Sequence, residues 1–149
     1  MYHTIDWRLL VLIGGMTAFG TAMENSGAAD FLAKGIVSLL SDFGKIPILL
    51  GFVIITVILT QPMSNAAAAL VIVPVAIKTA IELNSDPRSF AIAIMLAASV
   101  SLVTPFEPSC ILVYGPGKYR FRDFIRIGSP LTFILILVIV ALVPVFWPI

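Results

Sequence analysis

The sequence has few charged residues, one cysteine and one histidine. Charged residues make up 11% of its 149 residues and the net charge is +1, so no charge excess favours binding to nucleic acid. A single cysteine, Cys110, excludes an internal disulfide and a metal site built from several cysteines. The sequence has no Ser/His/Asp set, paired carboxylates or phosphate-binding loop, so an enzyme activity and an organic cofactor have no support.

Apolar residues dominate instead. They form 60% of the chain, and the mean hydropathy is +1.10. This composition is typical of a protein embedded in a lipid bilayer, and it predicts an all-α polytopic membrane protein. The N-terminus lacks a basic region and a small-residue cleavage site, so we expect the first apolar segment to be structure and not a signal peptide.

Three of the predicted segments are uninterrupted. Residues 9–24 are expected to form a transmembrane helix, and residues 128–148 form another, with Trp147 as an interfacial anchor. In residues 30–43, apolar side chains recur at helical spacing against polar ones, which predicts an amphipathic helix in the membrane interface. The same pattern also fits a connecting helix packed on neighbouring protein.

The sequence TQPMSN at residues 60–65 interrupts a long apolar stretch. Each flanking arm has roughly 14 residues, or about 21 Å of helix, which is short of a hydrocarbon core of about 30 Å. These lengths predict a re-entrant helical hairpin over residues 47–80 with its tip at residues 61–65. The alternative is one long span kinked at its proline.

A second interruption, TPFEPS at residues 104–109, predicts a broken transmembrane helix over residues 89–114. Pro105 and Pro108 lack N–H donors and push the preceding residues out of helical geometry, which frees backbone carbonyls. A charged Glu107 at membrane depth persists when it binds a cation, carries a proton or lies in a wet vestibule. Irregular backbone at this depth is tolerated where it lines a cavity, and secondary transporters build their sites this way.

Ser64 and Asn65 stand directly before an alanine-rich helix start. As an N-cap, either residue would leave backbone N–H groups and the positive end of the helix dipole facing the tip, where an anion can bind. Their side-chain oxygens are also suited to a hard cation such as Na⁺. A helix start capped after a prolyl turn, without a ligand, explains the local pattern equally well.

Four basic residues, Lys118, Arg120, Arg122 and Arg126, cluster before the last span. The positive-inside rule places this loop in the cytoplasm, with the C-terminus outside and the hairpin entering from outside.

Several short motifs follow one another along nearly the whole chain: DWR at 6–8, GG at 14–15, SNAAA at 64–68, TP at 104–105, and VYGPG, YRF and DF within 113–124. In this order they resemble the divalent anion:sodium symporters, the solute carrier 13-type permeases. The resemblance implies a protein of the bacterial inner membrane with two inverted repeats, each holding a re-entrant hairpin and a broken helix. Only the second repeat matches this chain, so the resemblance implies a missing N-terminal half or a second copy as partner, and a dimer.

The resemblance also implies roles for single residues. Ser64, Asn65 and Ala66 match the family's Ser-Asn-Thr tip, with alanine in place of threonine, and Thr104 and Pro105 match the helix break. The implied substrate-binding residues are Ser64, Asn65, Ala66, Thr104 and Pro105. The implied Na⁺ ligands are Ser64, Asn65, Thr104, Glu107 and Ser109.

Three functions follow from these observations. The first is the C-terminal half of a transporter that couples Na⁺ to a divalent anion such as sulfate, a dicarboxylate or citrate. The second is a proton-coupled transporter or exporter of the same superfamily, with Glu107 as the proton carrier. The third is a half-transporter that is inactive without a partner half.

Overall fold

The computed structural model describes residues 14–15, 18, 21–22, 25–40, 43–105, 110, 117 and 119–149. This part of the chain contains helices and no strand, so the predicted all-α class is confirmed for it. Most of the predicted span 9–24 lies outside the described residues. The helices are α2 (Ala28–Leu40), α3 (Lys45–Leu59), α4 (Asn65–Glu82), α5 (Pro87–Ala98) and α7 (Phe121–Phe146).

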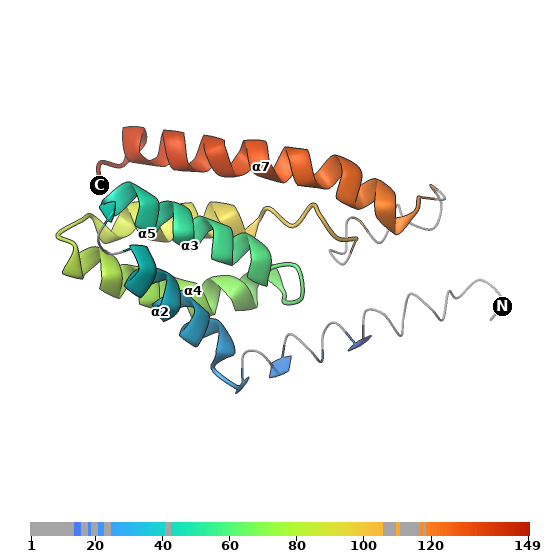
Figure 1. Ribbon diagram of the computed structural model, residues 1–149, viewed down its shortest axis with the longest axis horizontal. Coiled ribbons are helices and arrows are strands. Elements are labelled where there is room, and N and C mark those ends of the chain that lie inside the picture. The colour runs from blue at the N-terminus through green and yellow to red at the C-terminus, as the bar shows by residue number, and fades with distance from the viewer. Residues whose placement is uncertain are drawn as a thin grey trace.

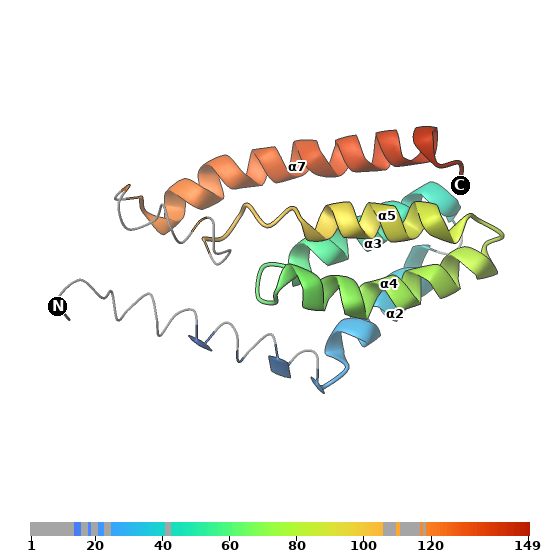
Figure 2. The same ribbon diagram turned by 180° about the vertical axis from the view of Figure 1, so that it is seen from behind.

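The helices run back and forth along one common direction. After α3 the chain reverses at residues 60–64, so α3 and α4 are two antiparallel helices and not one kinked helix (Figure 1). Next, α5 returns beside α4, continues as an extended segment, and leads to α7, which runs back along the bundle (Figure 2). The C-terminus therefore lies at the same end as the α4–α5 turn.

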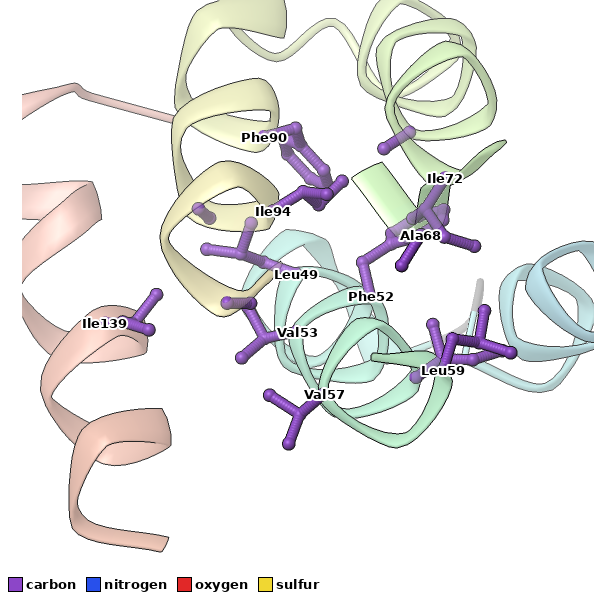
Figure 3. Close-up of a cluster of buried hydrophobic side chains, with 14 of the residues drawn as sticks. Leu49, Phe52, Val53, Val57, Leu59, Ala68, Ile72, Phe90, Ile94 and Ile139 are labelled. Atoms are coloured by element: carbon purple, nitrogen blue, oxygen red, sulfur yellow. The ribbon is translucent and has the colours of Figure 1, made fainter. Parts of the chain in front are cut away.

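Helix α3 is the centre of the core. Nine of its fifteen residues are buried, on more than one face, as expected for a helix that is apolar all round. Its side chains lie between Ile139 of α7 on one side and Ala68 and Ile72 of α4 on the other (Figure 3). Because α3 contacts α2, α4, α5 and α7, it sets the positions of all of them.

Helix α4 presents a stripe of three alanines and one isoleucine to this core. Ala68, Ile72, Ala76 and Ala80 recur at every fourth position and are fully buried. Alanines let neighbouring helices approach closely, and α4 and α5 form the most extensive helix pair of the bundle. Next to them, the rings of Phe52 and Phe90 pack edge to face with centroids 6.2 Å apart.

Hydrogen bonds fix the end of the bundle opposite the 60–64 turn. The Lys45 ammonium donates to the Asn84 carbonyl oxygen at 3.0 Å and so ties the start of α3 to the α4–α5 turn. The Ser89 hydroxyl donates to the Trp147 carbonyl oxygen at 3.0 Å and ties α5 to the C-terminal end of α7. Asp86 caps α5 by accepting from the Arg88 N–H at 2.9 Å.

Most of the surface of α7 is apolar and exposed. Its buried residues, Gly128, Thr132, Ile139 and Val143, form one narrow stripe along the 26-residue helix. By length and hydropathy, α7 and the 18-residue α4 are each long enough to cross a membrane. Helix α4 extends to Glu82, so the second arm of the hairpin is longer than the predicted arm, which ends at residue 80.

Helix α2 packs against α3 and α4, which fits the second interpretation of the amphipathic segment, a connecting helix on neighbouring protein. Val37 and Leu40 pack against the core, whereas Phe31 and Leu39 of the predicted apolar stripe are exposed. Its bounds, Ala28–Leu40, begin and end earlier than the predicted 30–43.

Helix α5 ends at Ala98, well before the break predicted at residue 104. Residues 100–102 are not helical, where the sequence predicts that the helix continues. In this segment the Ser101 hydroxyl donates to the Thr60 carbonyl oxygen across the bundle, in a long hydrogen bond of 3.5 Å.

Gly128 lets this extended segment lie directly on α7. A Cβ atom at Gly128 would overlap the Leu102 carbonyl oxygen and lie 2.7 Å from the Leu102 carbonyl carbon. Any larger residue at 128 would therefore push the extended segment away from α7.

We expect Gly128→Ala to destabilise the protein by about 1–3 kcal/mol, because the added methyl group overpacks a backbone contact. The measurement is the melting temperature of the detergent-solubilised protein. Gly35→Ala is the matched control, since a Cβ there meets nothing within 4 Å and alanine favours a helix. Equal melting temperatures for the two variants would contradict the close contact.

Candidate functional site

The turn at residues 60–64 satisfies the carbonyl groups at the end of α3. The Val57 carbonyl oxygen accepts from the Thr60 hydroxyl at 2.8 Å and from the Gln61 side-chain amide at 2.9 Å. The carbonyl oxygens of Ile58 and Leu59 accept backbone N–H groups of the turn. The last carbonyl groups of a helix have no partner within the helix, and leaving them unsatisfied in an apolar environment is costly. The hydrogen bonds of the turn remove this cost.

Ser64 caps the start of α4. Its backbone is extended, with φ −67° and ψ 147°, and its Oγ accepts from the Ala67 N–H at 3.1 Å. Its carbonyl oxygen accepts from the Ala68 N–H at 3.0 Å. The predicted N-cap is thus confirmed, and the positive end of the α4 dipole faces the turn.

The first interruption contacts the described beginning of the second one. The Thr104 hydroxyl donates to the Gln61 side-chain oxygen at 2.9 Å, across 43 residues of sequence. The Ser101 hydroxyl adds a second link to the Thr60 carbonyl oxygen. The turn after α3 and the extended segment after α5 therefore form one polar layer between apolar helices.

The structure describes five of the seven predicted site residues. Ser64 and Ala66 are exposed, Asn65 and Thr104 are half-buried, and Pro105 is buried. Thr104 is brought to the turn through Gln61. Glu107 and Ser109 lie outside the described residues.

Sequence reasoning missed two members of this layer, Gln61 and Ser101. Gln61 lies inside the predicted tip, but its partner Thr104 is distant in sequence, so no local pattern assigns it a role. Ser101 stands within an apolar run. A hydroxyl group in such a run is the sequence feature that could have indicated its place in the polar layer.

The described part of the layer is chemically uniform. Residues 60–65 and 99–105 contain no charged side chain, and they offer hydroxyl, amide and carbonyl oxygens together with the N–H groups at the start of α4. Oxygen atoms of this kind suit a hard cation, and helix N–H groups suit an anion. Among the described residues, no group of three or more His, Cys, Asp or Glu side chains is placed to hold a metal.

Comparison with known proteins places this geometry in context. Residues 1–148 match the citrate transporter (CitMHS) family. An uncharacterized transporter of Synechocystis sp. is 38% identical over 138 residues, which are 92% of this chain and 22% of that protein. Sodium/sulfate cotransporter 2 of Chlamydomonas reinhardtii is 32% identical over 130 residues, which are 85% of this chain and 14% of that protein.

A third relative, the uncharacterized transporter YfbS of Escherichia coli, is 32% identical over 148 residues, or 99% of this chain and 24% of that protein. The chain thus spans about a quarter or less of the length of these curated relatives. No solved structure matches it. The relatives are named as transporters and not as enzymes, and with the two long apolar helices they indicate a membrane protein.

We expect Ser64→Ala to cost about 1 kcal/mol of stability, because the Ala67 N–H loses its acceptor at the start of α4. Thermal melting measures this loss. Ser38→Ala is the control, since the Ser38 hydroxyl is exposed and bonds only to Gly35 within α2. If Ser64→Ala melts no earlier than Ser38→Ala, the cap does not stabilise the turn.

Proposed function

The chain belongs to the citrate transporter family, and from this premise we propose that it forms the C-terminal half of a secondary active transporter for a small divalent anion. Na⁺ is the proposed coupling ion, and sulfate or a dicarboxylate is the proposed substrate. The observation that supports this most is the bond between Thr104 and Gln61, because it joins two helix interruptions into one site. The names of the sodium/sulfate cotransporter relatives support the choice of ion and anion.

The two ligands would lie next to each other in the polar layer and share Ser64 and Asn65. The anion would lie at the start of α4, near Ser64, Asn65 and Ala66, where the helix dipole is positive. Na⁺ would lie among the oxygens of Ser64, Asn65 and Thr104. Beyond the described residues, Glu107 and Ser109 would complete its coordination, and Pro105 would border the substrate.

In this proposal the α3–α4 hairpin is re-entrant, and α5 with the extended segment is the first part of a broken transmembrane helix. The basic residues 118–126 would lie in the cytoplasm of a bacterial inner membrane, with the C-terminus outside. The chain would act as one inverted repeat. Its partner would be an N-terminal half or a second copy, within a dimer.

Counterflow of labelled sulfate and succinate in proteoliposomes, with and without Na⁺, tests the proposal. The chain is assayed alone and together with a complementary half of the family. We expect Na⁺-dependent flux of sulfate or of succinate for the assembled protein, and no flux of either anion for the chain alone. Flux that follows a pH gradient instead would favour the proton-coupled alternative, and no flux of either anion would refute the proposed transport of sulfate or a dicarboxylate.

Within this assay, Asn65→Ala is expected to lower Na⁺-dependent uptake roughly ten- to a hundredfold, because a hydrogen bond to a charged ligand is lost. Glu82→Gln is the control, since Glu82 is exposed at the far end of the same helix. Membrane insertion is checked by protein recovery in the bilayer. Unchanged uptake kinetics in Asn65→Ala would remove this residue from the site.

For Glu107→Gln we expect a shift in the dependence of uptake on pH or on the cation, because a titratable and negatively charged group is replaced by a neutral one. Uptake is measured across pH values at fixed Na⁺, and across Na⁺ concentrations at fixed pH. A profile that matches the unsubstituted protein would place Glu107 at the wet edge of a vestibule instead.

A further inference from the structure

We propose that Gln61 is a positioning residue for the cation: it orients the Thr104 hydroxyl so that Thr104 meets a ligand only with its oxygen lone pairs. This inference rests on the proposed function, because it concerns the same layer of residues. It adds a residue that the family resemblance does not assign, and it determines which side of the layer receives the cation.

The first step is the orientation of the Gln61 amide. A side-chain amide has an NH₂ group that donates and an oxygen that accepts. One end of this amide lies 2.9 Å from the Val57 carbonyl oxygen, which can only accept. The NH₂ group must therefore face Val57, and the amide oxygen must face away from α3.

The second step is the orientation of the Thr104 hydroxyl. Its partner at 2.9 Å is the Gln61 amide oxygen, which has no proton to give. The Thr104 hydroxyl therefore donates its only proton to the Gln61 amide oxygen, and the lone pairs of the Thr104 oxygen remain available to a ligand. In this state Thr104 can coordinate a cation or accept from an N–H group, but it cannot donate to an anion.

The third step is the field around this pair. Gln61 lies two residues after Leu59, the last residue of α3, and Thr104 is hydrogen-bonded to Gln61. Helix C-termini carry the negative end of the dipole and favour cations. The start of α4 carries the opposite end and favours anions, so the cation would lie toward Gln61 and Thr104 and the anion toward the α4 N-terminus.

The burial of the residues fits this role. Gln61 and Thr104 are half-buried, so their bond is partly shielded from water while one side remains accessible to a ligand. Thr56 of α3 is 0% exposed and donates its hydroxyl to the Phe52 carbonyl oxygen at 2.6 Å. Thr56 therefore also bonds a carbonyl group of α3, but it lies outside the polar layer and has no hydrogen bond to Thr104.

This difference supplies a matched control. Gln61→Met keeps a side chain of similar length and removes both hydrogen bonds. Thr56→Val removes a hydroxyl bond to an α3 carbonyl group and leaves Gln61 and Thr104 unchanged. Thr104→Val removes the hydroxyl, and Thr104→Ser keeps it.

The experiment measures the Na⁺ concentration for half-maximal anion uptake, for the chain assembled with a complementary half in proteoliposomes. We expect Gln61→Met and Thr104→Val each to raise it about five- to tenfold, the loss that one hydrogen bond predicts. The double variant should raise it no further, because both changes disable the same oxygen. Thr104→Ser and Thr56→Val should stay near the unsubstituted value.

A second measurement separates failure of this inference from failure of transport. The melting temperature of the detergent-solubilised protein is recorded with NaCl and with an equal concentration of choline chloride. Cation binding should raise the melting temperature of the unsubstituted protein and of Thr56→Val, but not that of Gln61→Met.

The outcomes are distinct. If the assembled protein moves no anion, the proposed function fails, and the melting shift alone decides the role of Gln61. The inference is overturned if Gln61→Met keeps the Na⁺-dependent shift or the normal Na⁺ dependence of uptake, if the two single changes are additive, or if Na⁺ has no effect on the unsubstituted protein.

Discussion

The hydrogen bond between Thr104 and Gln61 is the contact on which the arrangement of this protein depends. An apolar bundle cannot leave the ends of its helices without partners, because unsatisfied carbonyl and N–H groups are costly away from water. The turn after α3 and the segment after α5 solve this problem jointly: Gln61 and Thr60 cover the last carbonyls of α3, and Thr104 and Ser101 bond back to them. Polar atoms gather at one level because each interruption satisfies the other.

Packing holds the two interruptions in register. Helix α3 is buried on several faces and contacts each of the other helices, so its end defines the level of the polar layer. On the other side of that layer, Gly128 lets α7 lie against the extended backbone at Leu102. The extended segment is therefore fixed between a hydrogen bond to the turn and a backbone contact to α7, which gives a neutral, oxygen-rich site a defined geometry.

Several features of the fold and the site could be read directly from residues. The all-helical class follows from composition, the interruption at residues 60–65 from its polar and proline content, and the N-cap at Ser64 from the alanine-rich run behind it. The early end of α5 could not be predicted, because residues 99–103 are mostly apolar and continue a helical pattern. The partner of Ser101 in this segment is the Thr60 carbonyl oxygen, 41 residues away, which no local pattern shows. For the amphipathic segment, packing of α2 on α3 and α4 was one of two equal interpretations.

By itself, the sequence determined the all-helical class, the interruption between α3 and α4, and the start of α4, since these depend on composition and on contacts within a few residues. The tertiary structure alone decided that Gln61 faces Thr104, that Ser101 faces Thr60, and that Gly128 receives the extended backbone. Each of these contacts joins residues between 26 and 43 positions apart along the chain. The path of the chain through the bundle determines such pairs, and a local pattern of residue types does not predict that path.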